Sequence, residues 1–196
     1  MKPTLEEVKK LASQGEYKVV PVSREILSDV KTPIEVLRIL KNVSKHCYIL
    51  ESVAGHEKWG RYTFLGYDPK LEITCLNGTM KVGSITFESA DPDPYIRQVL
   101  AEHKSPRLEG LPSFTGGLVG YFSYDYIKYA EPTLRLDAKD TERFKDVDLM
   151  LFDKVIAFDN FRQKIILIVN ISLEDVDSEY NRARLELDTM ERLIRS

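Results

Sequence analysis

The sequence has no basic cluster, no long apolar run and no repeat. Its 28 Lys and Arg residues against 31 Asp and Glu give a net charge of −3, and the basic residues are scattered along the chain. A nucleic-acid surface needs a basic stripe that displaces counterions from phosphates, so that class of partner is disfavoured. No apolar run approaches the ~20 residues that span a bilayer. The opening residues, MKPTLEEVKKLASQGE, are too acidic and polar for a signal or transit peptide.

Cysteine and histidine, which often carry redox or metal chemistry, are few. The two cysteines, Cys47 and Cys75, each lie in a predicted strand. A disulfide between them is compatible with the sequence, but two buried free thiols in a reducing compartment are favoured. We therefore expect a cytoplasmic protein. The three histidines lie in separate elements without the spacing of metal ligands, so no metal site is predicted.

Helix-start signals are clear at several places. Thr4–Glu7 and Thr32–Glu35 are capping boxes, and the second adds a proline at N1 that predicts a helix over 33–43. Asp93 is expected to cap a third helix. The apolar residues between Val176 and Ile194 recur at steps of four and three, which predicts a final amphipathic helix.

Strands outnumber these helices, and most are joined by hairpins rather than by crossover helices. They are predicted at Lys18–Val22, Cys47–Glu51, Arg61–Leu65, Leu71–Leu76, Met80–Val82, Ile85–Phe87, Phe114–Tyr124, Leu149–Phe158 and Lys164–Ile171. Asn77-Gly78 favours a tight hairpin turn. The run Ile165–Ile171 is apolar on both faces, so we expect it at the centre of a sheet. The fold class is therefore α+β, with largely antiparallel β-sheets packed with amphipathic helices.

One glycine-rich stretch, Thr115–Gly120, invites comparison with a phosphate-binding loop. It lacks the Gly-Lys-Ser/Thr ending of a P-loop and the full spacing of a dinucleotide motif. Two interpretations stay open: a strand whose backbone is approached closely by a neighbour, and a platform for a ligand. The residues alone favour the first, because glycine removes the side chain that holds a neighbour away.

The best candidate for a binding site is Glu51-Ser52, at the end of a predicted strand. The carboxylate suits the ammonium of an amino-acid zwitterion, and the hydroxyl suits its carboxylate. Arg61 supplies a fork that can grip a carboxylate in two places, and the loop Val53–Trp59 would be free to order over a ligand. The alternative is a solvated strand end with an ordinary surface loop, and physical chemistry alone favours that alternative by about two to one.

Three motifs, spaced along the chain, change that balance. They are Ile49-Leu-Glu-Ser52, Gly60-Arg-Tyr-Thr-Phe-Leu-Gly66 and Phe114-Thr-Gly-Gly-Leu-Val-Gly-Tyr-Phe-Ser-Tyr-Asp125. Together they resemble the N-terminal region of the anthranilate synthase component I family, in which the first usually reads Leu-Leu-Glu-Ser and the second Gly-Arg-Tyr-Ser-Phe-Leu-Gly. The departures, Ile49 and Thr63, are conservative. The resemblance covers nearly the whole chain.

The resemblance implies an enzyme that converts chorismate and an ammonia source to anthranilate and pyruvate, the first committed step toward tryptophan. Tryptophan inhibits that family by feedback, and its Glu-Ser motif forms part of the tryptophan pocket. This places Leu50, Glu51 and Ser52 at an effector site, and Arg61 joins them because its charge suits a carboxylate. The glycine-rich strand would help to frame the neighbouring core.

The resemblance also implies what the chain lacks. The family's chorismate site and Mg²⁺ ligands lie in a C-terminal region longer than this chain, and none of its motifs occurs here. Residues 1–196 are therefore expected to form a single N-terminal regulatory and scaffold domain without catalytic residues, metal or cofactor. The implied partners are the missing catalytic domain, the glutamine amidotransferase subunit (component II) and L-tryptophan. Since the family's pocket also takes residues from the missing half, the domain alone would lose several hydrogen bonds of ~1 kcal/mol each.

Two alternatives remain. Aminodeoxychorismate synthase component I shares the architecture, and its product would distinguish it. A stand-alone amino-acid-binding or interaction module that catalyses nothing is the second, and a reading frame that continues into a catalytic half would exclude it.

Overall fold

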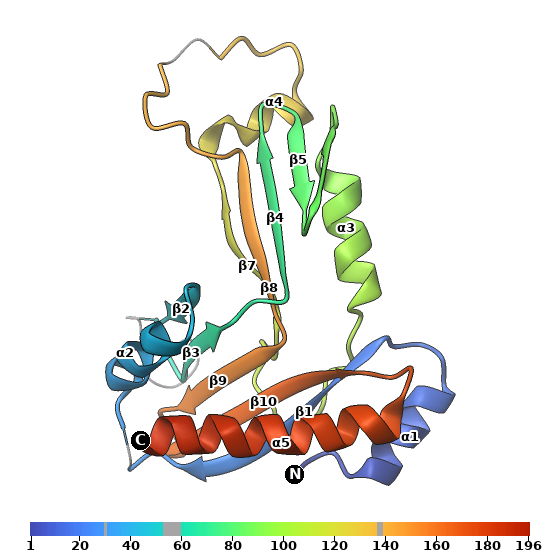
Figure 1. The fold of residues 1–196 in the computed structure, drawn as a ribbon, viewed down its shortest axis with the longest axis vertical. Helices are drawn as coiled ribbons and strands as arrows, with labels where there is room; N and C mark the ends of the chain where they lie inside the picture. The colour runs from blue at the N-terminus through green and yellow to red at the C-terminus, as the bar shows by residue number, and fades with distance from the viewer. Residues whose placement is uncertain (30, 53–59, 137–138) are drawn as a thin grey trace. The chain divides into compact units, whose positions relative to one another are not determined.

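The computed structural model describes residues 1–29, 31–52, 60–136 and 139–196 (Figure 1). These residues divide into two compact units, each with a sheet and a hydrophobic core of its own. Unit 1 comprises Met1–Pro69, His103–Gly116 and Phe152–Ser196, and unit 2 comprises Lys70–Glu102 and Gly117–Leu151. The single regulatory domain expected from the sequence stays a prediction.

The sheet of unit 1 has five strands, all antiparallel to their neighbours. Their spatial order is β1 (Val19–Leu27), β10 (Lys164–Ser172), β9 (Lys154–Asp159), β3 (Tyr62–Tyr67) and β2 (Cys47–Leu50). Three helices belong to this unit: α1 (Leu5–Ser13), α2 (Pro33–Val43) and α5 (Val176–Arg195). The long helix α5 runs along the sheet (Figure 1).

Both predicted capping boxes are confirmed. The Thr4 hydroxyl accepts the backbone N–H of Glu7 at 3.4 Å, and the Glu7 carboxylate accepts that of Thr4 at 2.7 Å. Thr32 and Glu35 make the same reciprocal pair at 3.3 and 2.8 Å. Each box satisfies two backbone donors that a helix start otherwise leaves unpaired, which explains why the sequence located these starts to the residue.

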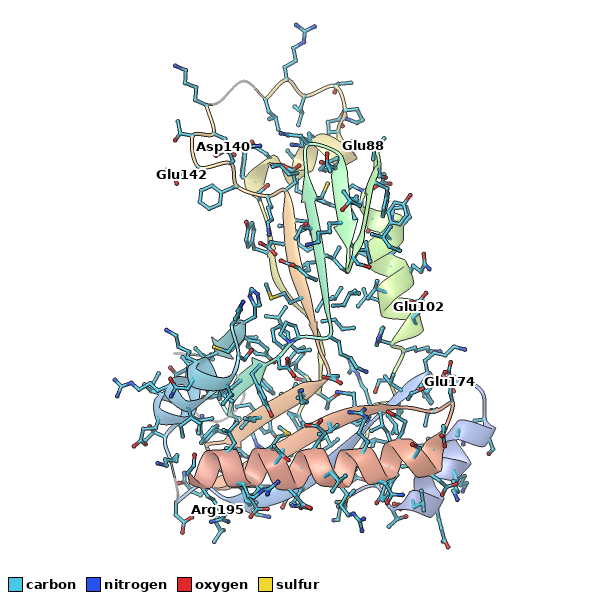
Figure 2. The ribbon with its side chains drawn as sticks, viewed as in Figure 1. Glu88, Glu102, Asp140, Glu142, Glu174 and Arg195 are labelled. Carbon is cyan, nitrogen blue, oxygen red and sulfur yellow. The ribbon has the colours of Figure 1, made fainter. Side chains whose placement is uncertain are left out.

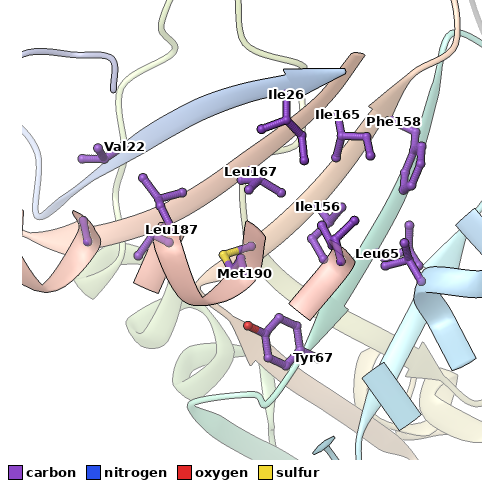
Figure 3. Close-up of a cluster of buried hydrophobic side chains, with 14 of the residues drawn as sticks. Val22, Ile26, Leu65, Tyr67, Ile156, Phe158, Ile165, Leu167, Leu187 and Met190 are labelled. Atoms are coloured by element: carbon purple, nitrogen blue, oxygen red, sulfur yellow. The ribbon is translucent and has the colours of Figure 1, made fainter. Parts of the chain in front are cut away.

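The core of unit 1 lies mainly between the sheet and its helices. Leu187 and Met190 of α5 meet Ile156 of β9 and Leu167 of β10 in this core (Figure 3). The alternate side chains of β10, Ile166 and Ile168, are buried in a second cluster. The strand predicted for the centre of a sheet, β10, is buried on both faces and lies between β1 and β9. It is therefore an interior strand, but the central strand of the five is β9.

The sheet of unit 2 also has five strands. Their order is β6 (Ile85–Glu88), β5 (Thr79–Val82), β4 (Leu71–Leu76), β8 (Val147–Phe152) and β7 (Gly117–Phe122). Helix α3 (Asp93–Glu102) buries Ile96 and Val99 in the core of this unit, and a 3₁₀ turn (Tyr124–Tyr126) leads into the short helix α4 (Ile127–Ala130). The Asn77-Gly78 turn has φ of 49° and 87°, the two positive values that a type I′ hairpin requires. The α+β class with antiparallel sheets is confirmed.

Charged side chains cover the outside of each unit. Figure 2 labels Glu88, Glu102, Asp140, Glu142, Glu174 and Arg195, all of which are exposed. The charge-rich stretch 137–148 reads in the sequence as a solvated loop; residues 139–144 are exposed as that reading predicts, but Asp146 is buried. Asp146 accepts hydrogen bonds from Lys128 at 2.7 Å and from the Tyr129 hydroxyl at 2.7 Å, and these partners replace the lost water.

Other sequence predictions need correction. The strand expected over 149–158 is two strands, β8 and β9, which belong to different sheets. The break falls at Asp153, whose carbonyl accepts both the backbone and the side-chain amide of Asn170. The apolar periodicity of α2 and α3 predicts that Val43 and Leu100 face inward, but both are exposed, because the buried residues of each helix form a narrower stripe than its apolar residues. Cys47 and Cys75 are free thiols, but only Cys75 is fully buried.

The dependence of unit 1 on α5 can be measured with one substitution at two neighbouring positions. Leu187 is fully buried against the sheet, whereas Leu185 on the same helix is 62% exposed. Leu187→Ala is expected to lower the free energy of unfolding by about 2–5 kcal/mol, since it removes core contacts and leaves a cavity. Leu185→Ala should stay within about 0.5 kcal/mol of the parent in urea unfolding. Equal losses would contradict the described burial.

Candidate functional site

The predicted site lies where β2 ends and β3 begins. The two strands are antiparallel, with Cys47 opposite Tyr67 and Leu50 opposite Phe64. This register brings the residues that follow Leu50 beside those that precede Tyr62. Glu51 and Ser52 are exposed, and so is nearly half of Leu50. The structure therefore brings Glu51 and Ser52 to the same end of the sheet as Arg61, while the loop Val53–Trp59 lies outside the described residues.

Arg61 is already paired with a carboxylate of its own unit. Its Nε donates to Asp159 Oδ1 at 3.0 Å, and its Nη2 donates to Asp159 Oδ2 at 2.6 Å. The Arg61 side chain is 29% exposed, whereas that of Asp159 is 2% exposed. The guanidinium also stands over the ring of Tyr62, with its Cζ 4.8 Å from the ring centroid. The fork that was expected to grip a ligand thus grips Asp159 with one edge.

The turn that carries Asp159 is bonded to the chain around Arg61. The backbone N–H of Asn160 donates to the Arg61 carbonyl at 2.9 Å. Asp159 Oδ1 also accepts the backbone N–H groups of Phe161 at 3.2 Å and Arg162 at 3.1 Å. The strands predicted at Leu149–Phe158 and Lys164–Ile171 indicate a hairpin turn here, but the sequence assigns Asp159 no role. The signal that was present is an Asp at a turn, whose side chain commonly bonds the backbone two or three residues on.

The ion pair fixes the charge of both partners. Burial raises the pKa of Asp159, but the Arg61 guanidinium and the two turn N–H groups outweigh it and hold that pKa below its usual range. The hydrogen bond with Asp159 raises the pKa of Arg61. Both groups are therefore ionised at neutral pH, and the strand end keeps a fixed cation.

One face of the β2–β3 strand pair packs against aromatic rings. Phe114 packs edge-on against Phe64, with ring centroids 5.6 Å apart, and Tyr48 packs edge-on against Phe152 at 4.8 Å. Gly66 makes room for Tyr48, because a Cβ at that position would lie 2.3 Å from the tyrosine ring. The Tyr48 hydroxyl is buried without a hydrogen-bond partner among the described residues, and burial raises its pKa. This packing supports the strand pair on the face that carries Tyr48 and Phe64.

The glycine-rich strand is explained by close packing. A Cβ on Gly120 would lie 1.9 Å from the carbonyl oxygen of Asp148, and one on Gly116 would lie 2.5 Å from Asn170 Nδ2. Close approach of a neighbour is thus confirmed at both glycines. Gly117 begins β7, and Tyr121 near its end is exposed.

The described ranges hold neither a cluster of metal-ligating side chains nor a membrane-spanning helix. Within 1–29, 31–52, 60–136 and 139–196, no three His, Cys, Asp or Glu side chains gather as a metal site. No helix in these ranges is long and apolar enough to cross a bilayer.

The architecture and the polar strand end define an α+β protein with charged and polar side chains gathered where the edge strand β2 ends. The chain belongs to the family of chorismate binding enzymes, whose family model matches residues 45–193. That range contains both the β2–β3 site and the glycine-rich strand.

Relatives within this family extend over the whole chain. The chain is 38% identical over 200 residues to anthranilate synthase component 1 of Acinetobacter calcoaceticus, covering 97% of this chain and 40% of that protein. The protein of the same name from Pseudomonas aeruginosa is 38% identical over 199 residues, covering 96% and 39%. The chain therefore spans about two fifths of the length of these curated relatives.

A solved structure agrees in fold. The crystal structure of anthranilate synthase component I from Streptococcus pneumoniae TIGR4 superposes with a TM-score of 0.55 at 27% identity. The match covers 85% of this chain and 36% of that chain.

The pKa of Asp159 predicts a pH dependence of stability. Because the folded pKa lies below that of the unfolded chain, the ion pair contributes fully above about pH 4 and its contribution is lost as the pH falls through the folded pKa. Asp159→Asn is expected to cost about 2 kcal/mol at pH 7, since it weakens a largely buried ion pair. Urea unfolding of both proteins from pH 2 to 7 should show the difference shrinking toward low pH. A difference that is constant with pH would contradict this account.

The steric role of Gly120 can be separated from its backbone conformation. Gly120 has a φ of 158° with the Asp148 carbonyl beside it, whereas Gly110 has a φ of 83° with no atom within 4 Å of an added Cβ. Gly120→Ala is expected to cost more than about 3 kcal/mol, because the backbone of β8 must shift. Gly110→Ala should cost about 1 kcal/mol from the positive φ alone. Thermal unfolding in which Gly110→Ala is the more damaging change would refute the close approach.

Proposed function

We propose that this chain is the N-terminal regulatory part of an anthranilate synthase component I. Such a protein, when whole, forms anthranilate and pyruvate from chorismate and an ammonia source. The observation that carries the proposal is the similarity of 96–97% of this chain to proteins of that name at 38% identity. The chorismate chemistry, with its Mg²⁺, would belong to residues outside these 196.

The proposed effector is L-tryptophan, bound at Leu50, Glu51, Ser52 and Arg61. The Glu51 carboxylate would take the ammonium group, and the Ser52 hydroxyl would donate to one carboxylate oxygen. Arg61 would donate to the other oxygen through Nη1, because Nε and Nη2 already serve Asp159. Leu50 offers an apolar contact for the indole. The exposure of the strand end and the fixed charge of Arg61 support this assignment.

The proposal also includes the setting of the protein. The glutamine amidotransferase subunit, component II, would supply ammonia, and feedback by tryptophan would couple the strand end to the catalytic half. A cytoplasmic location fits the two free thiols. An allosteric effect of this kind requires that tryptophan bind the inhibited state more tightly than the active one.

The test is an inhibition assay on the full-length gene product with component II. Ser52→Ala should raise the tryptophan concentration for half-inhibition about tenfold, since it removes a hydrogen bond to a charged group. Ser84→Ala, at an exposed turn of unit 2, is the matched control and should leave the inhibition curve unchanged.

Three outcomes would contradict parts of the proposal. Absence of anthranilate would refute the activity, and formation of aminodeoxychorismate would favour the sister enzyme. Inhibition that Ser52→Ala leaves unchanged would refute the effector site.

A further inference from the structure

The turn between β9 and β10 engages Arg61 through both its side chain and its main chain. Asp159 binds the guanidinium with two hydrogen bonds of 3.0 and 2.6 Å, and the Asn160 N–H binds the Arg61 carbonyl at 2.9 Å. Phe161 adds its ring, 5.8 Å from the guanidinium carbon. The position of Arg61 is therefore set from a hairpin almost a hundred residues away in sequence.

Asp159 is itself held rigidly. Its side chain is 2% exposed, and Oδ1 accepts the N–H groups of Phe161 and Arg162 in addition to Arg61 Nε. A carboxylate fixed by several donors cannot turn away from its partner without leaving buried groups unpaired. Asp159 thus presents a single orientation to the guanidinium.

The geometry of the pair leaves one end of the guanidinium available. Arginine has five N–H donors in a fixed planar fork. Asp159 takes the edge formed by Nε and Nη2, and within the described residues Nη1 donates to no acceptor. Because the fork is planar, fixing that edge also fixes the direction of the two Nη1 donors.

We propose that Asp159 is a positioning residue of the effector site, which aims Arg61 Nη1 at the carboxylate of the amino acid bound beside Glu51 and Ser52. This inference rests on the proposed tryptophan site. It adds that the affinity of the site depends on a residue that never touches the ligand. A preorganised donor binds more tightly than a mobile one, because less side-chain freedom is lost on binding.

The test uses Asp159→Asn, which is nearly isosteric. Asparagine keeps an oxygen for the N–H groups of Phe161 and Arg162, but it replaces the oxygen that accepts from Arg61 Nη2 with a donor. The turn should therefore stay closed, and Arg61 should keep its bond through Nε but lose the charge-assisted bond through Nη2. Asp159→Glu, which keeps the charge, should recover part of the grip.

Two readouts are taken on the same variants, the first on the 196-residue chain and the second on the full-length gene product. The first is the ¹⁵N NMR signal of the Arg61 Nη2–H group, which the bond to Asp159 Oδ2 protects from exchange and which should disappear in Asp159→Asn. The second is the Kd for L-tryptophan, which should rise at least about tenfold, the loss expected for a charge-assisted hydrogen bond. Asp188→Asn is the matched control, because it removes a 2.6 Å contact with Arg24 elsewhere in unit 1. This control should change neither the NMR signal of Arg61 nor the Kd for tryptophan.

A double-variant comparison separates positioning from general damage. If Asp159 acts through Arg61, then Arg61→Gln combined with Asp159→Asn binds tryptophan no more weakly than Arg61→Gln alone. If the fold-losses in tryptophan affinity of the two single variants multiply in the double variant, the inference is overturned. An unchanged Kd in Asp159→Asn would also overturn it. A full-length parent protein that binds no tryptophan would instead refute the proposed site, and the inference would fall with it.

Discussion

The strand β9 is the element on which unit 1 depends. All six of its residues are buried, and it pairs with β10 on one side and with β3 on the other. It therefore joins the two long strands of the sheet, β1 and β10, to the shorter strands β3 and β2, which carry the candidate site. Its last residue, Asp159, ends the buried run with a charge that must be paired, since a lone buried carboxylate is costly. Arg61 provides that pair.

This arrangement gives the strand end two different supports. Behind β2 and β3 lie aromatic rings, which contact the strands through apolar surface. At the side lies the turn after β9, which makes directional hydrogen bonds. Packing fixes the distance of the strands from the core, and the hydrogen bonds fix the orientation of one charged group. A site built on supported strands is more exact than one built on a free loop.

The sequence predicted the elements whose signals are local. The capping boxes at Thr4 and Thr32, the Asn77-Gly78 turn and the stripe of α5 each depend on residues within one or two turns, and each is confirmed. The split of one predicted strand at Asp153 was missed, because both halves are apolar and periodicity alone does not report a change of sheet.

The candidate site was predicted only in part, because some of its residues are close together in sequence and others are far apart. Glu51, Ser52 and Arg61 were found from motifs that lie close together in sequence, and the pairing of β2 with β3 places them at one end of the sheet. The bond from Arg61 to Asp159 was missed, since it joins residues 98 positions apart. The burial of Asp146 was missed because its partners, Lys128 and Tyr129, belong to another element.

The central claim is that the end of β2, with Arg61 beside it, binds an amino-acid zwitterion. The most direct measurement is an amide-NMR titration of the 196-residue chain with L-tryptophan, which registers binding even in the millimolar range. The account predicts saturable shifts centred on Leu50, Glu51, Ser52 and Arg61, with unit 2 unaffected. Saturable shifts centred on any other strand, or none at millimolar tryptophan from a folded chain, would contradict it.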